Sequence, residues 1–412
     1  MKVLHVLQGY PPAMGGTEQA FAHISEELVR QFADDVTVFT TNCYGGDGFN
    51  RFGLKRMRAG KEVIKGVKVF RFRVLSLVSW LLKLPQFLAY KLKLPGDQWL
   101  RTLYQGPIIA GLGKKIRKSD ADLVVASSFP LLHMYTALRA ARKSRKRIAF
   151  AGGLHPDDQW SFDRPIIAQA LIKADGCIAY TGYEAEQLKK MGVDPKRIYT
   201  IGLGVDMVST PKMSQISARK KFGLRDGPVI GFIGQISAHK GVGQLIEAMK
   251  VVWSQIPEAQ LLIAGAKRPF AEKIKKMIDL LPEEQKEKVV LIFNFEEEEK
   301  SLLYMALDIF VYPSKYESFG IAFLEAWNAH RPVIAFKYGA IPWVVDDKVN
   351  GLLVEPPDPT ALAEPIIFLL RNSQVRHSLA ENGFQKVASQ YTWPGIANQF
   401  HVVYRDIAER RK

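Results

Sequence analysis

Residues 311–329 read VYPSKYESFGIAFLEAWNA, and this stretch decides the fold prediction. Residues 308–312 are mostly apolar and predict a short strand, a polar turn follows, and apolar residues at helical spacing then predict a helix. Gly320 lies in the turn, where its lack of a side chain permits a close backbone approach. A strand, a tight turn and a helix in this order direct free backbone N–H groups at one point. The stretch therefore predicts an anion-binding turn.

Two glutamates, Glu317 and Glu325, flank the start of this predicted helix. If most of the stretch were helical, their separation would be about 12 Å, at ~1.5 Å per residue. Glycoside hydrolases hold their two carboxylates closer, at roughly 5–10 Å. The larger gap suits two contacts with one extended ligand, because a carboxylate accepts hydrogen bonds from vicinal hydroxyls. With a phosphate between them, this predicts a nucleotide-sugar. The alternative is a solvated helix face with two ordinary glutamates.

Further motifs follow: RPVIA at 331–335, GAIP at 339–342 and NGLLVEP at 350–356. Together with ESFG at 317–320, they resemble the retaining nucleotide-sugar glycosyltransferases of the GT-B fold, glycosyltransferase family 4. The resemblance implies an α/β protein of two Rossmann-like domains that face each other across a cleft. It also implies a C-terminal helix that crosses back to the first domain.

The resemblance assigns expected roles to the residues of the 311–329 stretch. Glu325 is expected to bind the ribose of the donor, and Glu317 is expected to contact the donor sugar as a catalytic residue. Four residues between them are expected to bind the sugar and phosphate, three of them through backbone amides: Ser318, and then Phe319, Gly320 and Ile321.

The chain has 412 residues, which suits two domains of about 200 residues better than one. We expect the acceptor-side domain at 1–208, joined by a crossover helix at 394–412. The domain that binds the nucleotide-sugar is expected at 209–393.

The second domain opens with another strand, glycine turn and helix, in which Gly234 ends the strand and Lys240 lies in the turn. Lys240 is placed to meet a diphosphate as a catalytic cation, whereas a surface lysine is the alternative. The family usually has an arginine where this chain has Gln235, so one of two expected phosphate cations is missing. Phe295 follows a later strand, where the family binds the base through backbone contacts.

The first domain opens with a strand, a loop containing Gly16, and a helix. In a parallel sheet this loop lies at the edge that binds ligands, and the resemblance places Gly16 near the donor phosphate and the acceptor. A simple helix start capped by Thr17 is the alternative. His155 follows the strand at 147–151, and the family often has a histidine here near the donor sugar. A locally hydrogen-bonded loop histidine is the alternative.

No metal site is predicted. Asp120 and Asp122 form a D-x-D sequence, but they precede a strand and therefore lie at the edge of the sheet away from ligands. We interpret them as solvated loop acids. Cys43 and Cys177 are the only cysteines and have neither metal-ligand spacing nor a disulfide framework, which fits a reducing compartment.

Residues 74–118 combine apolar stretches with lysines, tryptophans and tyrosines. The longest uncharged run, 74–82, is too short to span a bilayer. This composition is typical of a segment that lies in a membrane interface. One or two core helices under a basic surface are the alternative.

The chain carries 57 Lys and Arg against 41 Asp and Glu, a net charge of +16. This charge favours nucleic acid, a membrane surface or phosphorylated substrates as partners. The basic residues are dispersed and form no recognition motif, so we expect no nucleic acid. The first apolar run is too short for a signal peptide. We expect a cytoplasmic protein, peripheral at the inner membrane surface.

The resemblance implies a retaining, metal-independent hexosyltransferase. It would use a UDP- or GDP-sugar as co-substrate, without a cofactor, and a glycan or lipid-linked acceptor. Lys240 and helix N-termini would stabilise the departing diphosphate. The alternatives are a non-catalytic relative that binds sugar nucleotides, a nucleotide-sugar epimerase, a phosphorylase (whose cofactor-lysine motif is not found) and a nucleic-acid-binding protein.

Overall fold

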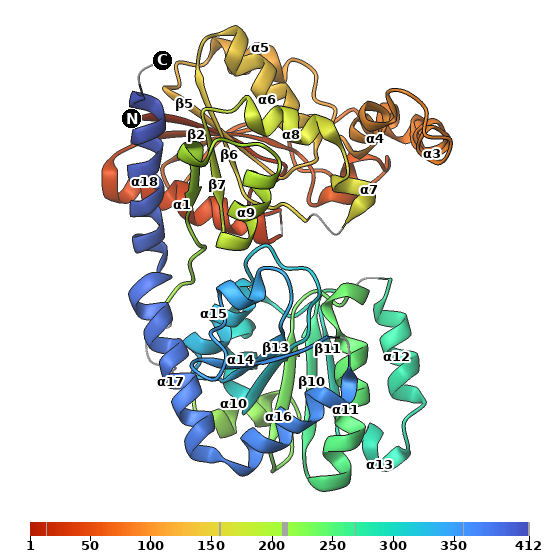
Figure 1. The fold of residues 1–412 in the computed structure, drawn as a ribbon. Helices are drawn as coiled ribbons and strands as arrows, with labels where there is room; N and C mark the ends of the chain where they lie inside the picture. Colours follow the sequence, from red (N-terminus) through yellow and green to blue (C-terminus); the bar gives the residue numbers. More distant parts are fainter. Residues whose placement is uncertain (14, 156–157, 208–212, 268, 357, 411–412) are drawn as a thin grey trace. The chain divides into compact units, whose positions relative to one another are not determined.

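Two parallel sheets form the framework of the chain in the computed structural model, which describes residues 1–13, 15–155, 158–207, 213–267, 269–356 and 358–410 (Figure 1). The chain divides into unit 1, Met1–Leu203 with Trp393–Lys412, and unit 2, Gly204–Thr392. The expected boundary between 208 and 209 lies outside the described residues.

Unit 1 contains an eight-stranded sheet in the order β3-β4-β2-β1-β5-β6-β7-β8. The pair β3–β4 is antiparallel, and the other pairs are parallel. The strands are β1 (Lys2–Val6), β2 (Asp35–Thr41), β3 (Gly60–Ile64), β4 (Val67–Phe72), β5 (Leu123–Ser127), β6 (Arg147–Ala151), β7 (Gly176–Ala179) and β8 (Ile198–Thr200). The helices are α1 (Gly16–Phe32), α2 (Ser76–Leu81), α3 (Lys83–Lys91), α4 (Asp97–Gln105), α5 (Leu112–Lys118), α6 (Leu132–Lys143), α7 (Gln159–Phe162), α8 (Pro165–Ile172), α9 (Gly182–Lys190) and α18 (Trp393–Glu409), with 3-10 turns at Gly46–Phe49 and Pro195–Arg197.

Helices cover both faces of this sheet, so its central strands β1 and β5 are largely buried. Leu4 and Val6 of β1 pack in the cluster that contains α5 and α6. On the other face, His5 bonds to Ser25 of α1 and, at 3.1 Å, to the hydroxyl of Tyr404 in α18. Burial lowers the pKa of His5 to about 3. The last helix of the chain is therefore part of the core of unit 1.

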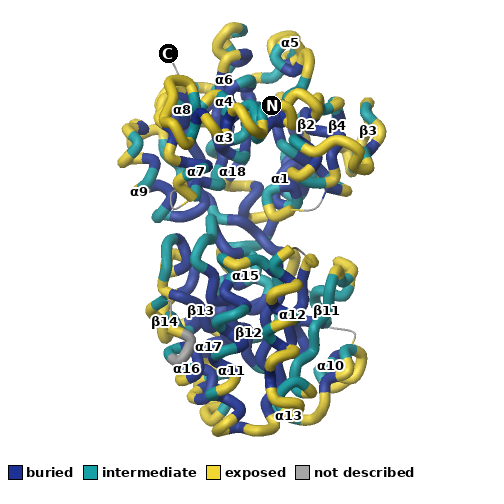
Figure 2. Tube along the Cα trace, turned by 90° about the vertical axis from the view of Figure 1, so that its right-hand side faces the viewer, coloured by how far each residue is buried: buried dark blue, intermediate teal, exposed yellow. Residues whose placement is uncertain are grey.

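Unit 2 contains a fully parallel six-stranded sheet in the order β11-β10-β9-β12-β13-β14. Figure 2 shows β12 and β13 buried and the outer surface of α13 exposed. The strands are β9 (Val229–Ile233), β10 (Gln260–Gly265), β11 (Val289–Phe293), β12 (Ile309–Tyr312), β13 (Val333–Phe336) and β14 (Gly351–Val354). The helices are α10 (Gln215–Lys221), α11 (Val242–Gln255), α12 (Ala271–Asp279), α13 (Glu283–Lys286), α14 (Lys300–Ala306), α15 (Ile321–Asn328), α16 (Pro359–Arg371) and α17 (Ser373–Gln390), with 3-10 turns at Ala238–Lys240, Glu297–Glu299 and Ile341–Trp343.

Two local expectations need correction. The helix after Glu317 begins only at Ile321, so the stretch between Glu317 and Glu325 is about half extended turn, and the rise of a continuous helix does not apply to it. Helix α1 begins at Gly16 with Gly15 as its N-cap, so Thr17 lies inside the first turn and does not cap the helix. Across the described residues, no helix is long and apolar enough to cross a membrane.

Candidate functional site

The site in unit 2 lies at the position in the sheet where the order of strand addition reverses. From β9 the chain proceeds outward through β10 and β11, then returns to pair β12 against the other side of β9. Loops that follow two such strands diverge and leave a crevice at their carboxyl ends, where ligands bind. Here the two loops also contact each other, because the Lys315 N–H donates to the His239 carbonyl at 2.8 Å.

Gly241 explains why these loops can approach so closely. It has φ +77°, and a Cβ at this position would lie 2.1 Å from the carbonyl oxygen of Pro313. Any other residue would push the β9 loop away from the β12 loop. The glycine therefore fixes Lys240, its neighbour, against the loop that carries Glu317.

Lys240 and Glu317 form a shielded ion pair. The Lys240 Nζ lies 2.5 Å from the Glu317 Oε1, and the two side chains are only 13% and 11% exposed. The same ammonium lies 5.4 Å from the centre of the buried Tyr312 ring. Burial disfavours the charged lysine, but Glu317 and Tyr312 outweigh that effect and hold the pKa of Lys240 above its ordinary value. Two of the expected catalytic residues thus meet, and the lysine is kept charged.

The turn before α15 has the geometry that the sequence predicts. Gly320 is the N-cap with φ +95°, and a Cβ there would lie 2.5 Å from the Phe323 ring. Phe319 packs its ring against Tyr391 at 5.4 Å and is 2% exposed, which anchors the turn. Ser318 and Ile321 are half-buried on either side. The turn therefore fixes the position of the first backbone N–H groups of α15.

Glu325 lies further along α15 and has two partners from α14. Its Oε2 accepts a hydrogen bond from the Tyr304 hydroxyl at 2.9 Å, and its Oε1 lies 2.7 Å from the Lys300 Nζ. Burial and the nearby Glu325 raise the pKa of Tyr304 well above its ordinary value. Neither partner was expected from the sequence, in which their spacing of four residues is the available signal, because it places both on one face of a helix.

The other expected donor contacts lie on the same sheet edge. Gly234 ends β9, and a Cβ there would lie 2.9 Å from the Tyr312 ring. Gln235 follows it with an exposed side chain, and Phe295 is half-buried just past β11. All three come directly after parallel strands, so their backbones share the edge with Lys240 and Glu317.

In unit 1, His155 lies in the loop after β6, and a buried glutamate accepts a hydrogen bond from the backbone of this loop. Glu184 of α9 accepts hydrogen bonds from the backbone N–H groups of Leu154 at 2.8 Å and Tyr180 at 2.7 Å. Burial raises the pKa of Glu184 to about 7. His155 itself makes an edge contact with the Phe162 ring at 5.8 Å. The sequence analysis missed Glu184, because nothing in its spacing distinguishes it from a surface glutamate of a helix.

A second buried acid explains the glycine loop before α1. Glu18 is 7% exposed, accepts a hydrogen bond from Gln8 at 2.9 Å, and has its pKa raised by burial. A Cβ at Gly15 would lie 2.2 Å from the Glu18 carboxylate, whereas one at Gly16 would meet nothing within 4 Å. Packing therefore requires a glycine at position 15 but not at position 16. The contact of Gly16 with the donor phosphate and the acceptor stays a prediction.

A cavity of about 400 Å³ opens at the carboxyl edge of the unit 1 sheet. None of the side chains that line it is charged. Three aromatic rings and three amides are among its lining side chains: Phe49, Tyr104 and Trp160, with Gln8, Asn50 and Gln105. Gln8 is the side chain that Glu18 orients.

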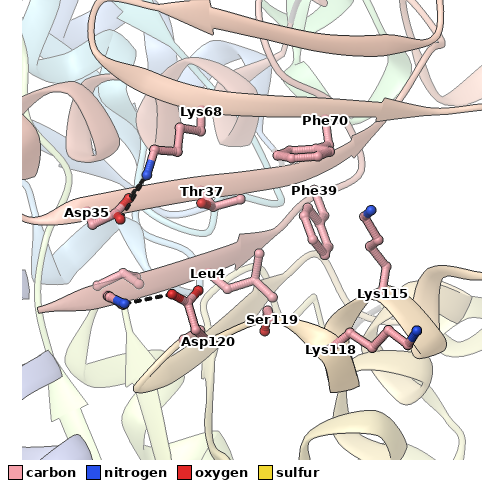
Figure 3. Close-up of a pocket in the computed structure, with 13 residues that line it drawn as sticks. Leu4, Asp35, Thr37, Phe39, Lys68, Phe70, Lys115, Lys118, Ser119 and Asp120 are labelled. Carbon is pink, nitrogen blue, oxygen red and sulfur yellow. Dashed lines mark hydrogen bonds and ion pairs between the residues drawn. The ribbon is translucent and has the colours of Figure 1, made fainter.

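A smaller pocket of about 280 Å³ lies at the opposite, amino edge of the same sheet (Figure 3). Two of its four lysines are paired with its two aspartates, because Lys68 contacts Asp35 at 2.7 Å and Lys2 contacts Asp120 at 2.6 Å, and Lys115 and Lys118 also line it. Asp120 is 79% exposed, so the D-x-D acids are the solvated loop acids that the sequence predicts. Within the described part of the chain, no three His, Cys, Asp or Glu residues gather so that they could hold a metal ion.

Comparisons with known proteins agree with this geometry. A family model described as glycosyl transferases group 1 matches residues 214–386, and one described as Glycosyltransferase Family 4 matches residues 14–208. A D-inositol 3-phosphate glycosyltransferase of Xylanimonas cellulosilytica is 30% identical, over 68% of this chain and 67% of that protein. An alpha-D-kanosaminyltransferase of Streptomyces kanamyceticus is 28% identical, over 46% of this chain and 48% of that protein. These matches span about half to two thirds of the relatives' length.

Solved structures share the architecture at low sequence identity. Anabaena HepE, in complex with UDP-glucose, superposes with a TM-score of 0.74 at 18% identity, over 98% of this chain and 100% of that one. Sucrose-phosphate synthase of Thermosynechococcus elongatus gives 0.74 at 21% identity, over 99% of both chains. The expected α/β architecture with two parallel-sheet domains of the GT-B type is confirmed.

Proposed function

Because this chain belongs to glycosyltransferase family 4, we propose that it transfers a hexose from a UDP- or GDP-sugar with retention of anomeric configuration. The acceptor is a glycan or lipid-linked precursor at an anionic membrane surface, and the reaction requires no metal ion or cofactor. The observation that carries the proposal is the Lys240–Glu317 pair at the switch point of the unit 2 sheet. UDP-glucose in the structurally similar HepE supports the donor class.

Lys240 stabilises the leaving group. As the bond from the anomeric carbon to the phosphate oxygen breaks, its electron pair moves to the diphosphate, which gains negative charge. A charged ammonium in a shielded site interacts strongly with that charge. The N–H groups at the start of α15 add uncharged donors to the same anion. Charge stabilisation by the chain thus takes the place of a divalent cation.

Glu317 positions the sugar and does not act as a nucleophile. One of its oxygens is bound to Lys240, which leaves the other to accept hydrogen bonds from sugar hydroxyls. A carboxylate bound to an ammonium is a poor nucleophile, so the proposal is a same-face displacement. The acceptor oxygen bonds to an oxocarbenium-like carbon, and its proton passes to the departing phosphate oxygen.

Glu325 receives the ribose. Tyr304 and Lys300 fix both of its oxygens, and each oxygen has a further lone pair for a ribose hydroxyl. This arrangement is pre-organised, because the carboxylate need not reorient when the donor binds. His155 remains a prediction for a contact with the donor sugar.

The aromatic and amide cavity of unit 1 is the candidate acceptor site. Its rings offer flat apolar faces to a sugar ring, and its amides offer donors and acceptors to the hydroxyls. The absence of charge from its lining favours a neutral saccharide over a phosphorylated one.

A non-catalytic relative that binds sugar nucleotides is the second candidate, and the uncharged, exposed Gln235 supports it. One experiment separates the two. The full chain is incubated with UDP-, GDP- and ADP-sugars, and both nucleotide release and the thermal unfolding midpoint are measured. We expect one UDP- or GDP-sugar to raise the midpoint and to be turned over without added metal. A raised midpoint without turnover of any donor would favour the binding protein, and dependence on added metal would contradict the charge assignment to Lys240.

A further inference from the structure

The helical segment 76–105 of unit 1, which comprises α2, α3 and α4, has its apolar side chains on the outside. The three helices pack on one another at the periphery of unit 1 (Figure 1). The large apolar side chains that they expose are Leu77, Val78, Trp80, Leu81, Leu84, Phe87, Leu88, Leu92, Leu94 and Trp99. Leu84 and Leu92 are more than 60% exposed. We call these ten side chains the apolar face.

The residues that α2–α4 bury are largely polar. Ser79 donates to the Leu103 carbonyl at 3.2 Å, and Arg101 is 3% exposed between Asp97, at 2.6 Å, and the face of the Tyr90 ring. Gln86 and Thr102 are also buried. A helix that packs only against its own protein buries its apolar stripe and exposes its polar one. Helices that expose their apolar side chains and bury their polar ones form a surface that binds an apolar partner.

The charge around the apolar face is of one sign. Residues 74–96 contain no aspartate or glutamate, and their lysines are Lys83, Lys91 and Lys93. All three lysines are exposed. Protein–protein interfaces are depleted in lysine relative to the rest of a surface. Lysines interleaved with leucine, phenylalanine and tryptophan are instead typical of helices that lie in the interface of an anionic membrane.

We propose that the apolar face docks into the headgroup region of a bilayer leaflet that contains anionic lipids. Leu81, Leu84 and Phe87 enter the acyl boundary, the lysines contact lipid phosphates, and Trp80 and Trp99 lie at the level of the headgroups. This surface deepens the proposed function, on which it rests for its purpose. Helix α4 carries exposed Trp99 at one end and Tyr104 and Gln105, which line the neutral cavity, at the other. A membrane-bound saccharide would therefore reach the cavity from the docked helices.

The test is co-sedimentation of the full chain with vesicles of phosphatidylcholine alone and of phosphatidylcholine with phosphatidylglycerol. We expect binding to the mixed vesicles and at least tenfold weaker binding to the neutral ones. The triple variant Leu81→Glu, Leu84→Glu, Phe87→Glu is expected to lose at least tenfold in binding to the mixed vesicles. Leu280→Glu in unit 2, where the native leucine is 85% exposed, is the matched control and should bind normally.

Two further measurements keep the outcomes distinct. Donor hydrolysis by the triple variant should be unchanged. If the native chain hydrolyses the donor but does not bind the mixed vesicles, the docking surface is overturned and the proposed sugar transfer is left intact. The thermal unfolding midpoint of the variant should not fall, because the replaced side chains are exposed. A stable homodimer of the native chain that the triple variant abolishes, without vesicle binding, would show that a second copy covers the face and would also overturn the proposal.

Discussion

Glutamates that are shielded from solvent in the two units are stabilised in opposite ways. In unit 2, Glu317 and Glu325 each contact a lysine, Lys240 at 2.5 Å and Lys300 at 2.7 Å. In unit 1, Glu18 takes its hydrogen bond from an amide side chain, and Glu184 takes its hydrogen bonds from backbone N–H groups. Unit 2 therefore holds cations ready in a shielded site, as an anionic diphosphate requires. Unit 1 uses uncharged donors beside a cavity that suits a neutral ligand.

Removal of the central cation should have the largest effect. Lys240→Ala leaves Glu317 shielded without a partner and leaves the diphosphate without its ammonium. We expect turnover to fall roughly 10²–10³-fold, the range for loss of one group that stabilises developing charge. Initial rates of nucleotide release measure it, with Lys250→Ala on α11, an exposed lysine paired with Glu247, as the control. Turnover within about threefold of the native chain would show that another group neutralises the leaving group.

Glu325→Ala should act on donor binding more than on turnover. The carboxylate accepts hydrogen bonds from the ribose, and bonds to a charged group contribute about 1.5–3 kcal/mol each. We expect donor affinity to fall roughly 10–100-fold with little change in the rate at saturation. Calorimetric titration measures it, and Glu247→Ala provides the exposed control. A change in turnover alone would place Glu325 at the reacting carbon and not at the ribose.

Glu184 provides a test in unit 1. Its pKa is raised to about 7 in the fold, whereas an unfolded glutamate titrates near 4.3. Between these values the folded chain binds more protons than the unfolded chain, so the free energy of unfolding falls as pH rises from about 4.3 to 7, by roughly 3 kcal/mol. In the variant Glu184→Gln, this part of the pH dependence of the free energy of unfolding should disappear. Urea unfolding at several pH values measures the difference between the native chain and the variant. If the free energy of unfolding depends on pH in the same way for both, the raised pKa of Glu184 is contradicted.

The smallest effect is expected from Tyr304→Phe. This variant removes one hydrogen bond to Glu325 and leaves Lys300 in place. This bond orients the carboxylate and does not contact the donor, so we expect only a three- to tenfold loss of donor affinity, about 1 kcal/mol. Tyr44→Phe, at an exposed tyrosine of unit 1, is the matched control. An unchanged affinity would show that Lys300 alone orients the carboxylate.

The sequence predicts the backbone geometry at the unit 2 sheet edge because the elements that form it are local. The strand, Gly320, and the start of α15 lie within a dozen residues, so propensity and turn geometry suffice to place them. Lys240 lies far away in sequence, yet its own strand, turn and helix predict the same sheet edge. Helix α14 supplies both Lys300 and Tyr304. Their spacing is the signal in the sequence, and their contact with Glu325 depends on packing between helices.

Unit 1 was harder to predict because its important contacts join distant segments. Glu18 and Glu184 look like helix-surface acids until packing places them under glycine loops. The segment 74–118 had two interpretations in the sequence, core helices or an interfacial segment. The structure divides the segment: Leu112 and Ile116 of α5 pack in the core, whereas the exposed leucines of α2–α4, together with buried Ser79 and Gln86, do not fit core helices. Composition identifies the unusual segment, whereas the direction of each side chain requires the structure.

The contact between His5 and Tyr404 has a consequence for biosynthesis. On the ribosome, the strands of unit 1 emerge first, but the helix that seals one face of their sheet is translated only after all of unit 2. Ile396, Phe400 and Tyr404 are buried in the folded chain. Until the last helix is made, the apolar surface of unit 1 that these side chains cover is exposed to solvent and prone to aggregation. Chaperones that act during synthesis would meet this intermediate, and a fusion at the carboxyl terminus that delays docking of the last helix would prolong its lifetime.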